Sequence, residues 1–247
     1  MAKVITVSVQ KGGDGKTTLA CNLAMAAVKA GFRTALIDID SQGNAGVTLS
    51  RNKNMHRVKE AGAQQIYEED SPVFTETESG VYLLHGHSWL EEIDYRDNVN
   101  QESVELRAKV RSLPFDYVII DTPPASSPRQ MAALFWADLV IIPVKPQQFS
   151  MIGLSKVLEQ IKLARRVNAG LSFRIVINQF TSSSTEQNQF VTELKAAFPS
   201  NLMKVFRSRV PVSDMLAQGS PVWDYKKDKS LGQEWYEFCI QVLNLIK

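Results

Sequence analysis

The most informative segment of this chain is the glycine-rich run Gln10-Lys11-Gly12-Gly13-Asp14-Gly15-Lys16-Thr17-Thr18. It follows the apolar run 4–9 and opens an Ala/Leu-rich run that ends near Gly31. A strand, a glycine loop and a helix in this order are the setting of a phosphate-binding loop. The usual pattern has glycine where Gln10 stands, so this is a variant loop with a lysine, Lys11, at its front edge.

The residue types in this loop suit phosphate. Its glycines let the backbone adopt positive φ angles, so that successive N–H groups can surround an anion at the start of the next helix. We expect Lys16 to reach the β- and γ-phosphates and the Thr17 hydroxyl to ligate Mg²⁺. The predicted nucleotide-binding residues of the loop are Gly12, Gly13, Asp14, Gly15, Lys16, Thr17 and Thr18.

Composition narrows the class of protein. The chain has 247 residues, is 44% hydrophobic and carries a net charge of +2, which is too small to indicate nucleic-acid binding without local clusters. No run approaches the ~20 apolar residues of a membrane span, and no signal peptide is evident. The two cysteines, Cys21 and Cys239, lie in apolar helical patterns, which favours core packing in a reducing compartment over a metal or iron–sulfur site.

Strand and helix patterns alternate along the chain. The strand patterns are continuous apolar runs, as in strands covered on both faces, so we predict a doubly wound α/β fold with a mostly parallel sheet, in a single domain 1–247. Strands are expected at 3–9, 34–39, 80–84, 116–121, 138–144, 172–178 and 202–206. Helices are expected at 16–30, 45–68, 99–112, 127–136, 150–167, 185–197, 212–218 and 231–246, with a loop at 69–79.

Acidic residues end two of these strands. Asp38 and Asp40 close the strand 34–39, and Asp121 closes the strand 116–121 before Thr122-Pro123-Pro124. Ligands of parallel sheets bind beyond the carboxyl ends of the strands, where the glycine loop also lies. A carboxylate fixed at a strand tip can orient Mg²⁺, and a carboxylate near a γ-phosphate can orient water. The alternative is that these aspartates only stabilise the turns that follow their strands.

Three motifs together resemble a known family. Lys11 to Thr18, Leu36-Ile37-Asp38-Ile39-Asp40-Ser41-Gln42-Gly43-Asn44 and Val118-Ile119-Ile120-Asp121-Thr122-Pro123-Pro124 resemble the ParA/Soj-type partition ATPases of the ParA/MinD superfamily, which have a deviant Walker A loop. The resemblance extends over essentially the whole chain. It implies the P-loop NTPase fold, ATP and Mg²⁺ as cofactors, and an ATPase that converts ATP and water to ADP and phosphate.

The resemblance also implies residue roles. Two ATP-bound subunits would form a sandwich homodimer, with Lys11 reaching the partner's phosphates and Lys16 acting within its own subunit. Asp40 resembles the residue that positions the hydrolytic water, with Thr17, Asp38 and Asp121 around Mg²⁺. The residues that would border the adenine are Asn178 and Pro211.

DNA binding is a further implication. The ATP-bound dimer would bind DNA without sequence preference, and slow hydrolysis, stimulated by a centromere-binding, ParB-like partner, would release it; the location would be cytoplasmic and nucleoid-associated. We expect the contacts at Lys204, Arg207 and Arg209. Other basic clusters lie at 162–166 and 226–229, and any of these could instead be a solvated face. No N-terminal helix-turn-helix domain is expected.

Alternatives remain. A MinD-like positioning ATPase would use its C-terminal helix on a membrane, but residues 231–246 lack a basic polar face and favour a helix docked on the core. A ParA-like ATPase that positions a protein cargo would have the same motifs. His85 and His87 alternate at a strand end, with no spacing typical of a metal site.

Asp14 departs from the resemblance. The family usually has a small apolar residue at this place in the loop. A carboxylate that pointed into the anion nest would repel phosphate. The alternatives for Asp14 are a position that faces solvent and one that faces the other subunit.

Overall fold

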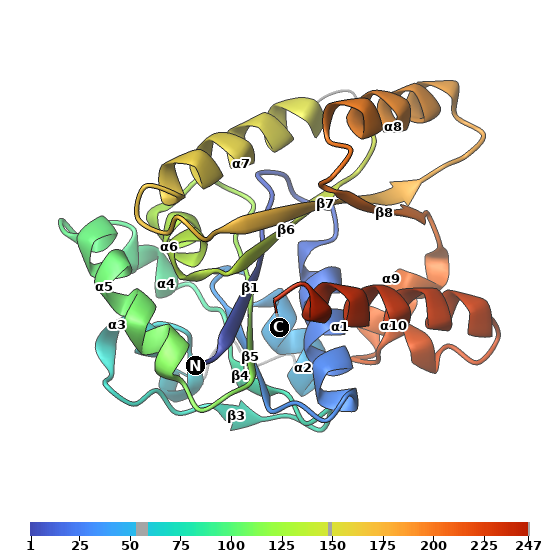
Figure 1. Cartoon of the computed structure of the whole chain (residues 1–247). Helices are drawn as coiled ribbons and strands as arrows, with labels where there is room; N and C mark the ends of the chain where they lie inside the picture. The colour runs from blue at the N-terminus through green and yellow to red at the C-terminus, as the bar shows by residue number, and fades with distance from the viewer. Residues whose placement is uncertain (53–58, 148–149, 247) are drawn as a thin grey trace.

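The computed structural model describes residues 1–52, 59–147 and 150–246, and all eight strands in these ranges lie in one sheet (Figure 1). The strand order is β3-β4-β2-β5-β1-β6-β7-β8, and only the β3–β4 pair is antiparallel. The strands are β1 (Lys3–Val7), β2 (Thr34–Asp38), β3 (Thr75–Glu76), β4 (Tyr82–Leu84), β5 (Tyr117–Asp121), β6 (Leu139–Val144), β7 (Ser172–Phe180) and β8 (Leu202–Arg207). The doubly wound, mostly parallel α/β fold is confirmed.

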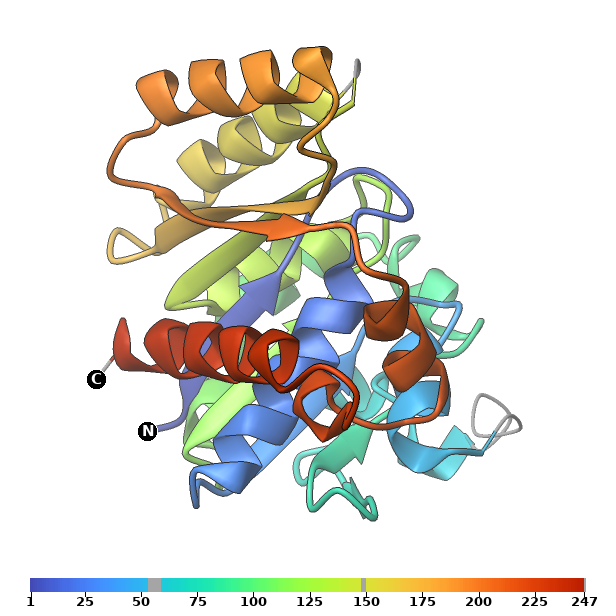
Figure 2. The same ribbon diagram turned by 90° about the vertical axis from the view of Figure 1, so that its right-hand side faces the viewer.

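Helices cover both faces of this sheet. Figure 2 shows α10 lying across α1 on one face, and Figure 1 shows α7 and α8 together at one end of the molecule. The longer helices are α1 (Lys16–Lys29), α2 (Asn44–Ser50), α5 (Val99–Ser112), α6 (Pro128–Trp136), α7 (Ser150–Ala164), α8 (Thr185–Ala197), α9 (Val210–Ala217) and α10 (Lys229–Asn244). The short ones are α3 (Gln65–Glu68), α4 (Leu90–Ile93) and the 3₁₀ turns η2 (Lys59–Ala61) and η3 (Val222–Asp224).

The core has two layers, one on each face of the sheet. Alternate residues of a strand enter different layers: in β6, Ile141 packs with α1 and α10, whereas Ile142 packs with α6 and α7. Both side chains are fully buried. A strand buried on both faces needs apolar residues at every position, which is why these strands are continuous runs of Val, Ile and Leu.

The predicted helix 45–68 is wrong. Helix α2 ends at Ser50, and Arg51 follows in the left-handed region with φ 53°. Beyond 53–58, which lie outside the described residues, the chain makes a parallel bridge between Gly62 and His85 before α3. The predicted loop 69–79 holds β3, which pairs with β4, and α4 was not predicted. Short elements of this kind depend on tertiary pairing, which local sequence patterns do not encode.

The sheet register brings the three motifs together. Val7, the last residue of β1, pairs with Asp121 of β5, and Asp121 pairs in turn with Asp38 of β2. The glycine loop therefore leaves the sheet beside both carboxylates. The central strands end at one edge, as expected for a ligand site in a parallel sheet.

Candidate functional site

The glycine loop connects β1 to α1 with two residues in left-handed conformation. Gly13 has φ 82° and Gly15 has φ 95°, which side chains rarely tolerate. A Cβ at Gly15 would also lie 2.2 Å from the Asn178 side-chain nitrogen. No side chain caps the start of α1, so its first N–H groups are available to a ligand. The loop borders a cavity of about 280 Å³ that is also lined by Asp40, Pro124 and Gln179.

Two lysines of the loop have different surroundings. Lys16 is 7% exposed, and its Nζ donates to the carbonyl oxygen of Lys11 at 3.0 Å. Burial lowers the pKa of the Lys16 ammonium, and three nearby carboxylates counter this only in part. Lys11 is partly exposed, and its Nζ donates to Gln147 Oε1 at 2.9 Å. The Lys16 side chain therefore lines the cavity beside the loop, whereas the Lys11 side chain lies at the rim of that cavity.

Thr17 and Asp121 form the pair expected around Mg²⁺. Thr17 Oγ1 donates to Asp121 Oδ2 at 2.7 Å, while Asp121 Oδ1 is buried with no hydrogen-bond partner. Burial raises the pKa of Asp121 to about 7, against the effect of the Thr17 hydrogen bond. A buried carboxylate oxygen without a partner beside a hydroxyl fits a hard cation that keeps most of its other ligands as water and phosphate. No group of three or more acidic, histidine or cysteine side chains poised for a metal occurs in the described ranges.

Asp38 holds the loop that follows β2. It is fully buried; Oδ1 accepts from the Asp40 N–H at 3.1 Å, and Oδ2 accepts from the N–H groups of Ala45 and Gly46 at 3.0 and 3.2 Å. Burial raises the pKa of Asp38 well above its usual value, as do the neighbouring carboxylates. Because both carboxylate oxygens accept backbone N–H groups, Asp38 fixes the start of α2. Its role at Mg²⁺ stays a prediction.

Asp40 faces the cavity from that loop. Its Oδ1 accepts from the backbone N–H of Gln42 at 3.0 Å, and the side chain lines the same space as Lys16 and Thr17. The second oxygen has no such anchor among the hydrogen bonds of the described residues. Asp40 is therefore oriented by its own turn and can accept a proton or a water hydrogen from the cavity.

Asp14 is buried, so of the alternatives left open by the sequence, a position facing solvent is excluded. It is 1% exposed, its Oδ1 has no partner, and Oδ2 lies 3.5 Å from the Lys145 nitrogen at the end of β6. Burial raises the pKa of the carboxyl group, and Lys145, Lys11 and Lys16 counter this. The loop thus carries an internal negative charge beside its lysines.

Replacing Asp14 with valine is expected to stabilise the protein. An unsatisfied buried polar group costs about 1–3 kcal/mol, so the free energy of unfolding of Asp14→Val should rise by this order at pH 8. Because burial raises the folded-state pKa above 3.8, the destabilising charge appears as pH rises, and the gain should be smaller at pH 5. Urea unfolding at both pH values measures this. Equal stability of variant and wild type at pH 8 would mean that the charge is compensated.

A second cavity continues the first one at the carboxyl ends of β7 and β8. It measures about 290 Å³ and shares Thr18 and Gln179 with the phosphate cavity. Asn178 lines it and donates to the Asp14 carbonyl oxygen at 3.0 Å. Pro211 lies in the first turn of α9, between two residues that line this cavity, Val210 and Val212. The two spaces together have the form of a phosphate site extended by a pocket for the rest of a nucleotide.

The site contains residues that the sequence motifs did not indicate. Gln179 has φ 57°, and its Nε2 donates to the Gly13 carbonyl oxygen at 3.0 Å. Gln147 holds Lys11 from the loop after β6. Gln179 directly follows the predicted site residue Asn178, which is the only sequence signal for it, and Gln147 lies in no motif.

Two of the three predicted DNA-contacting residues line the second cavity. Arg207 and Arg209 are exposed and line the second cavity. Lys204 does not line this cavity: its Nζ forms an ion pair of 2.8 Å with Glu234 of α10 and lies 5.5 Å from the centre of the Phe206 ring. Because strand side chains alternate, Lys204 shares the face of Phe206, which is covered by α10.

The C-terminal helix docks on the core as predicted. Trp235, Phe238 and Cys239 are at most 1% exposed, and Trp235 stacks on Phe206 at 4.4 Å between ring centres. Across the described ranges, no helix combines the length and apolarity that a membrane crossing requires. His85 and His87 are both fully buried.

The fold and the loop define a P-loop NTPase of the type with a deviant Walker A motif. The family model described as AAA domain matches residues 2–173. The chromosome partitioning protein ParA of Myxococcus xanthus is 32% identical over 257 residues, which cover 96% of this chain and 86% of that protein. The sporulation initiation inhibitor protein Soj of Bacillus subtilis is 30% identical, covering 96% of each chain. The chain therefore belongs to the ParA family of partition ATPases.

Other relatives are longer than this chain or are similar to it mainly in fold. The chain spans 64% of the length of the Escherichia coli protein IncC, to which it is 30% identical over 91% of its own length. Among solved structures, apo McdA of Cyanthece has a TM-score of 0.82 at 20% identity, with 98% and 100% of the two chains covered. MinD of Pyrococcus horikoshii with Mg-ADP has a TM-score of 0.77 at 21% identity, with 99% and 97% covered. These structures show the fold.

Proposed function

We propose that this chain is an ATP-dependent DNA partition protein. The proposal rests on the convergence of Lys16, Thr17 and Asp40 at one cavity, with Asp121 hydrogen-bonded to Thr17. Family membership supports ATP as the substrate, since the ParA and Soj relatives are 32% and 30% identical to this chain over nearly its whole length. ATP would occupy the two joined cavities, with its phosphates on the loop and its base toward Asn178 and Pro211.

Mg²⁺ would be held by Thr17 and Asp121. The metal would neutralise developing charge on the phosphates. The residues of this chain would do the rest: Lys16 would hold the phosphates, and Asp40 would orient the attacking water through its free oxygen. Hydrolysis would be slow in the isolated protein, as the resemblance implies, and stimulated by a ParB-like partner.

Dimerisation would complete the site. Lys11 lies at the rim of the cavity, so in a face-to-face sandwich dimer its ammonium could contact the phosphates bound by the second subunit. Its only hydrogen bond from Nζ in the described ranges is to the neutral Gln147, so a phosphate would be a stronger partner. A homodimer that forms on ATP binding is the state that would bind DNA, in the cytoplasm and on the nucleoid.

DNA contacts would come from Arg207 and Arg209. Both are exposed and belong to no ion pair among the described residues, whereas Lys204 is paired with Glu234. The double variant Arg207→Ala, Arg209→Ala is expected to weaken binding to random duplex DNA about tenfold or more and to reduce the salt slope by about 1 per lost contact. Fluorescence anisotropy with ATP at several salt concentrations measures both.

The control for this experiment is Lys195→Ala, because Lys195 is an exposed cation on α8. Since Arg207 and Arg209 also line the second cavity, ATP affinity must be measured on the same variants. Loss of DNA binding with ATP affinity kept supports the assignment. An unchanged DNA affinity of the double variant would mean that DNA binds to another surface of the protein. If the wild type bound no DNA in the presence of ATP, the protein-cargo alternative would be favoured.

A further inference from the structure

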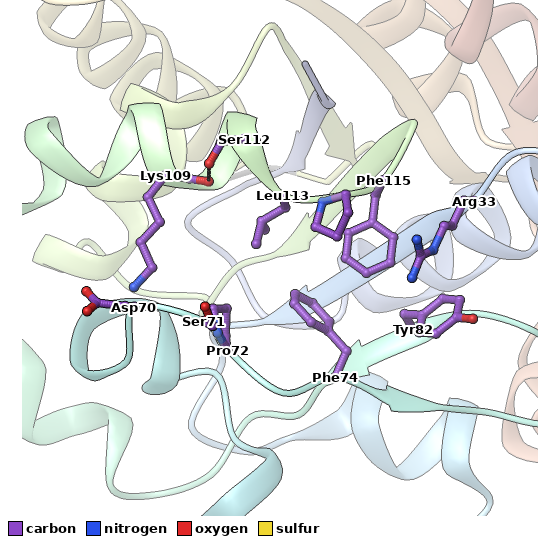
Figure 3. A pocket seen from close by; sticks show the side chains of 11 residues that line it. Arg33, Asp70, Ser71, Pro72, Phe74, Tyr82, Lys109, Ser112, Leu113 and Phe115 are labelled. Carbon is purple, nitrogen blue, oxygen red and sulfur yellow. Dashed lines mark hydrogen bonds between the residues drawn. The ribbon is translucent and has the colours of Figure 1, made fainter.

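A separate cavity lies at the edge of the sheet remote from the glycine loop. It measures about 440 Å³ and is bounded by the residues before β2 and β5, the end of α5 and the loop that leads into β3 (Figure 3). Strands β2 and β5 begin here and end at Asp38 and Asp121, so the two cavities lie at opposite ends of the same strands. No step of ATP binding or hydrolysis uses this space.

Aromatic rings form one wall of the cavity. The rings of Phe74 and Phe115 meet edge to face with 4.9 Å between centres, and Tyr82 lies 5.3 Å from Phe115. Figure 3 shows these three rings side by side, with Leu113 beside them. Such a wall suits a flat apolar or aromatic group, and the volume is that of small-molecule sites.

The polar groups lie at the two ends of this wall. At one end the Arg33 guanidinium lies 5.1 Å from the centre of the Tyr82 ring and 5.2 Å from that of Phe115. It takes part in no ion pair among the described residues; the nearby Asp116 carboxylate accepts the backbone N–H of Arg33 at 2.8 Å. The Arg33 side chain is therefore a positive group held in place by rings and open to an anion.

The other end is already occupied by internal contacts. Lys109 Nζ donates to the carbonyl oxygens of Ile66, at 2.7 Å, and Glu69. Burial lowers the pKa of Lys109, and Asp70 opposes this. Figure 3 shows Lys109 directed toward Asp70. The charge of Lys109 is thus satisfied within the chain, and an anionic ligand would be drawn to Arg33.

We propose that this cavity binds an aromatic carboxylate, with its ring against Phe74 and Phe115 and its carboxylate on Arg33. Such a group could be a free small acid or the last residue of a peptide that ends in phenylalanine or tryptophan. The guanidinium can bind a carboxylate through two parallel N–H groups, and this contact would fix the orientation of the ligand in the cavity. The proposal does not depend on the nucleotide site.

The test uses the full chain and indole-3-acetate as the probe. Titration calorimetry should give a dissociation constant of about 0.1 mM for a ligand of this size. Indole-3-acetamide, which lacks the charge, and the variant Arg33→Met, which keeps the packing over the rings, should each weaken binding about tenfold. A peptide ending in a free phenylalanine carboxylate, compared with its C-terminal amide, forms the second arm.

The matched control is Arg165→Met. Arg165 also stacks on a ring, 5.7 Å from the centre of Phe173, but it lies outside this cavity, so its loss should leave binding unchanged. Thermal melting by circular dichroism confirms that each variant is folded. Binding of either the acid or the peptide that is lost with Arg33→Met supports the proposal. No binding of either below about 5 mM, or equal binding to Arg33→Met, overturns it.

Discussion

Asp40→Asn is expected to lower the rate of ATP hydrolysis about 100- to 10,000-fold, the range for loss of a general base, while ATP binding is kept. The asparagine oxygen can still accept the Gln42 N–H that orients Asp40, at 3.0 Å in the wild type, so the turn should keep its shape. What is lost is the negative oxygen that faces the cavity. Phosphate release and equilibrium ATP binding, measured on the same preparation, separate the two effects.

A trapped state should follow from this variant. With ATP bound and not hydrolysed, the proposed DNA-binding dimer should stay on DNA longer than the wild type does. Asp38→Asn is the contrast, because Asp38 accepts three backbone N–H groups and its change should lower stability instead. If Asp40→Asn turned over ATP at the wild-type rate, the water-orienting role would belong to another group.

Lys16→Ala is expected to remove ATP binding. A charge-assisted hydrogen bond to phosphate contributes about 1.5–3 kcal/mol, and Lys16 can make more than one, so the loss should reach about 100-fold or more in affinity. The stability of the Lys16→Ala variant without nucleotide should not fall below that of the wild type. Burial lowers the pKa of Lys16, which means that its charge is unfavourable in the folded state, and its removal should not lower the melting temperature.

Melting with and without Mg²⁺ and ATP tests both parts. The wild type should be stabilised by the nucleotide, and Lys16→Ala should not. Lys11→Ala is the matched control from the same loop: the carbonyl oxygen that receives Lys16 Nζ is kept, so ATP should still bind while ATP-driven dimerisation is lost. A nucleotide-induced shift that survived in Lys16→Ala would contradict the assignment of this lysine.

Much of the site was predictable because its residues act through local geometry. A glycine with φ 95° before a helix and an aspartate at the tip of an apolar strand each leave a short pattern in the chain. The second cavity and the surroundings of Lys204 were less predictable. Gln179 reaches Gly13 from a residue 166 positions away, and the position of Lys204 depends on Glu234 of a helix that packs only in the folded protein.

The fold class, the phosphate loop and the carboxylates around it were predictable from local sequence patterns, because strand burial, loop conformation and helix start are short-range properties. The direction of Asp14, the loop contacts of Asp38 and the packing of Arg33 on the rings of Tyr82 and Phe115 became evident only in the folded structure. These facts depend on contacts between segments distant in the chain, and side-chain direction in such contacts is set by packing.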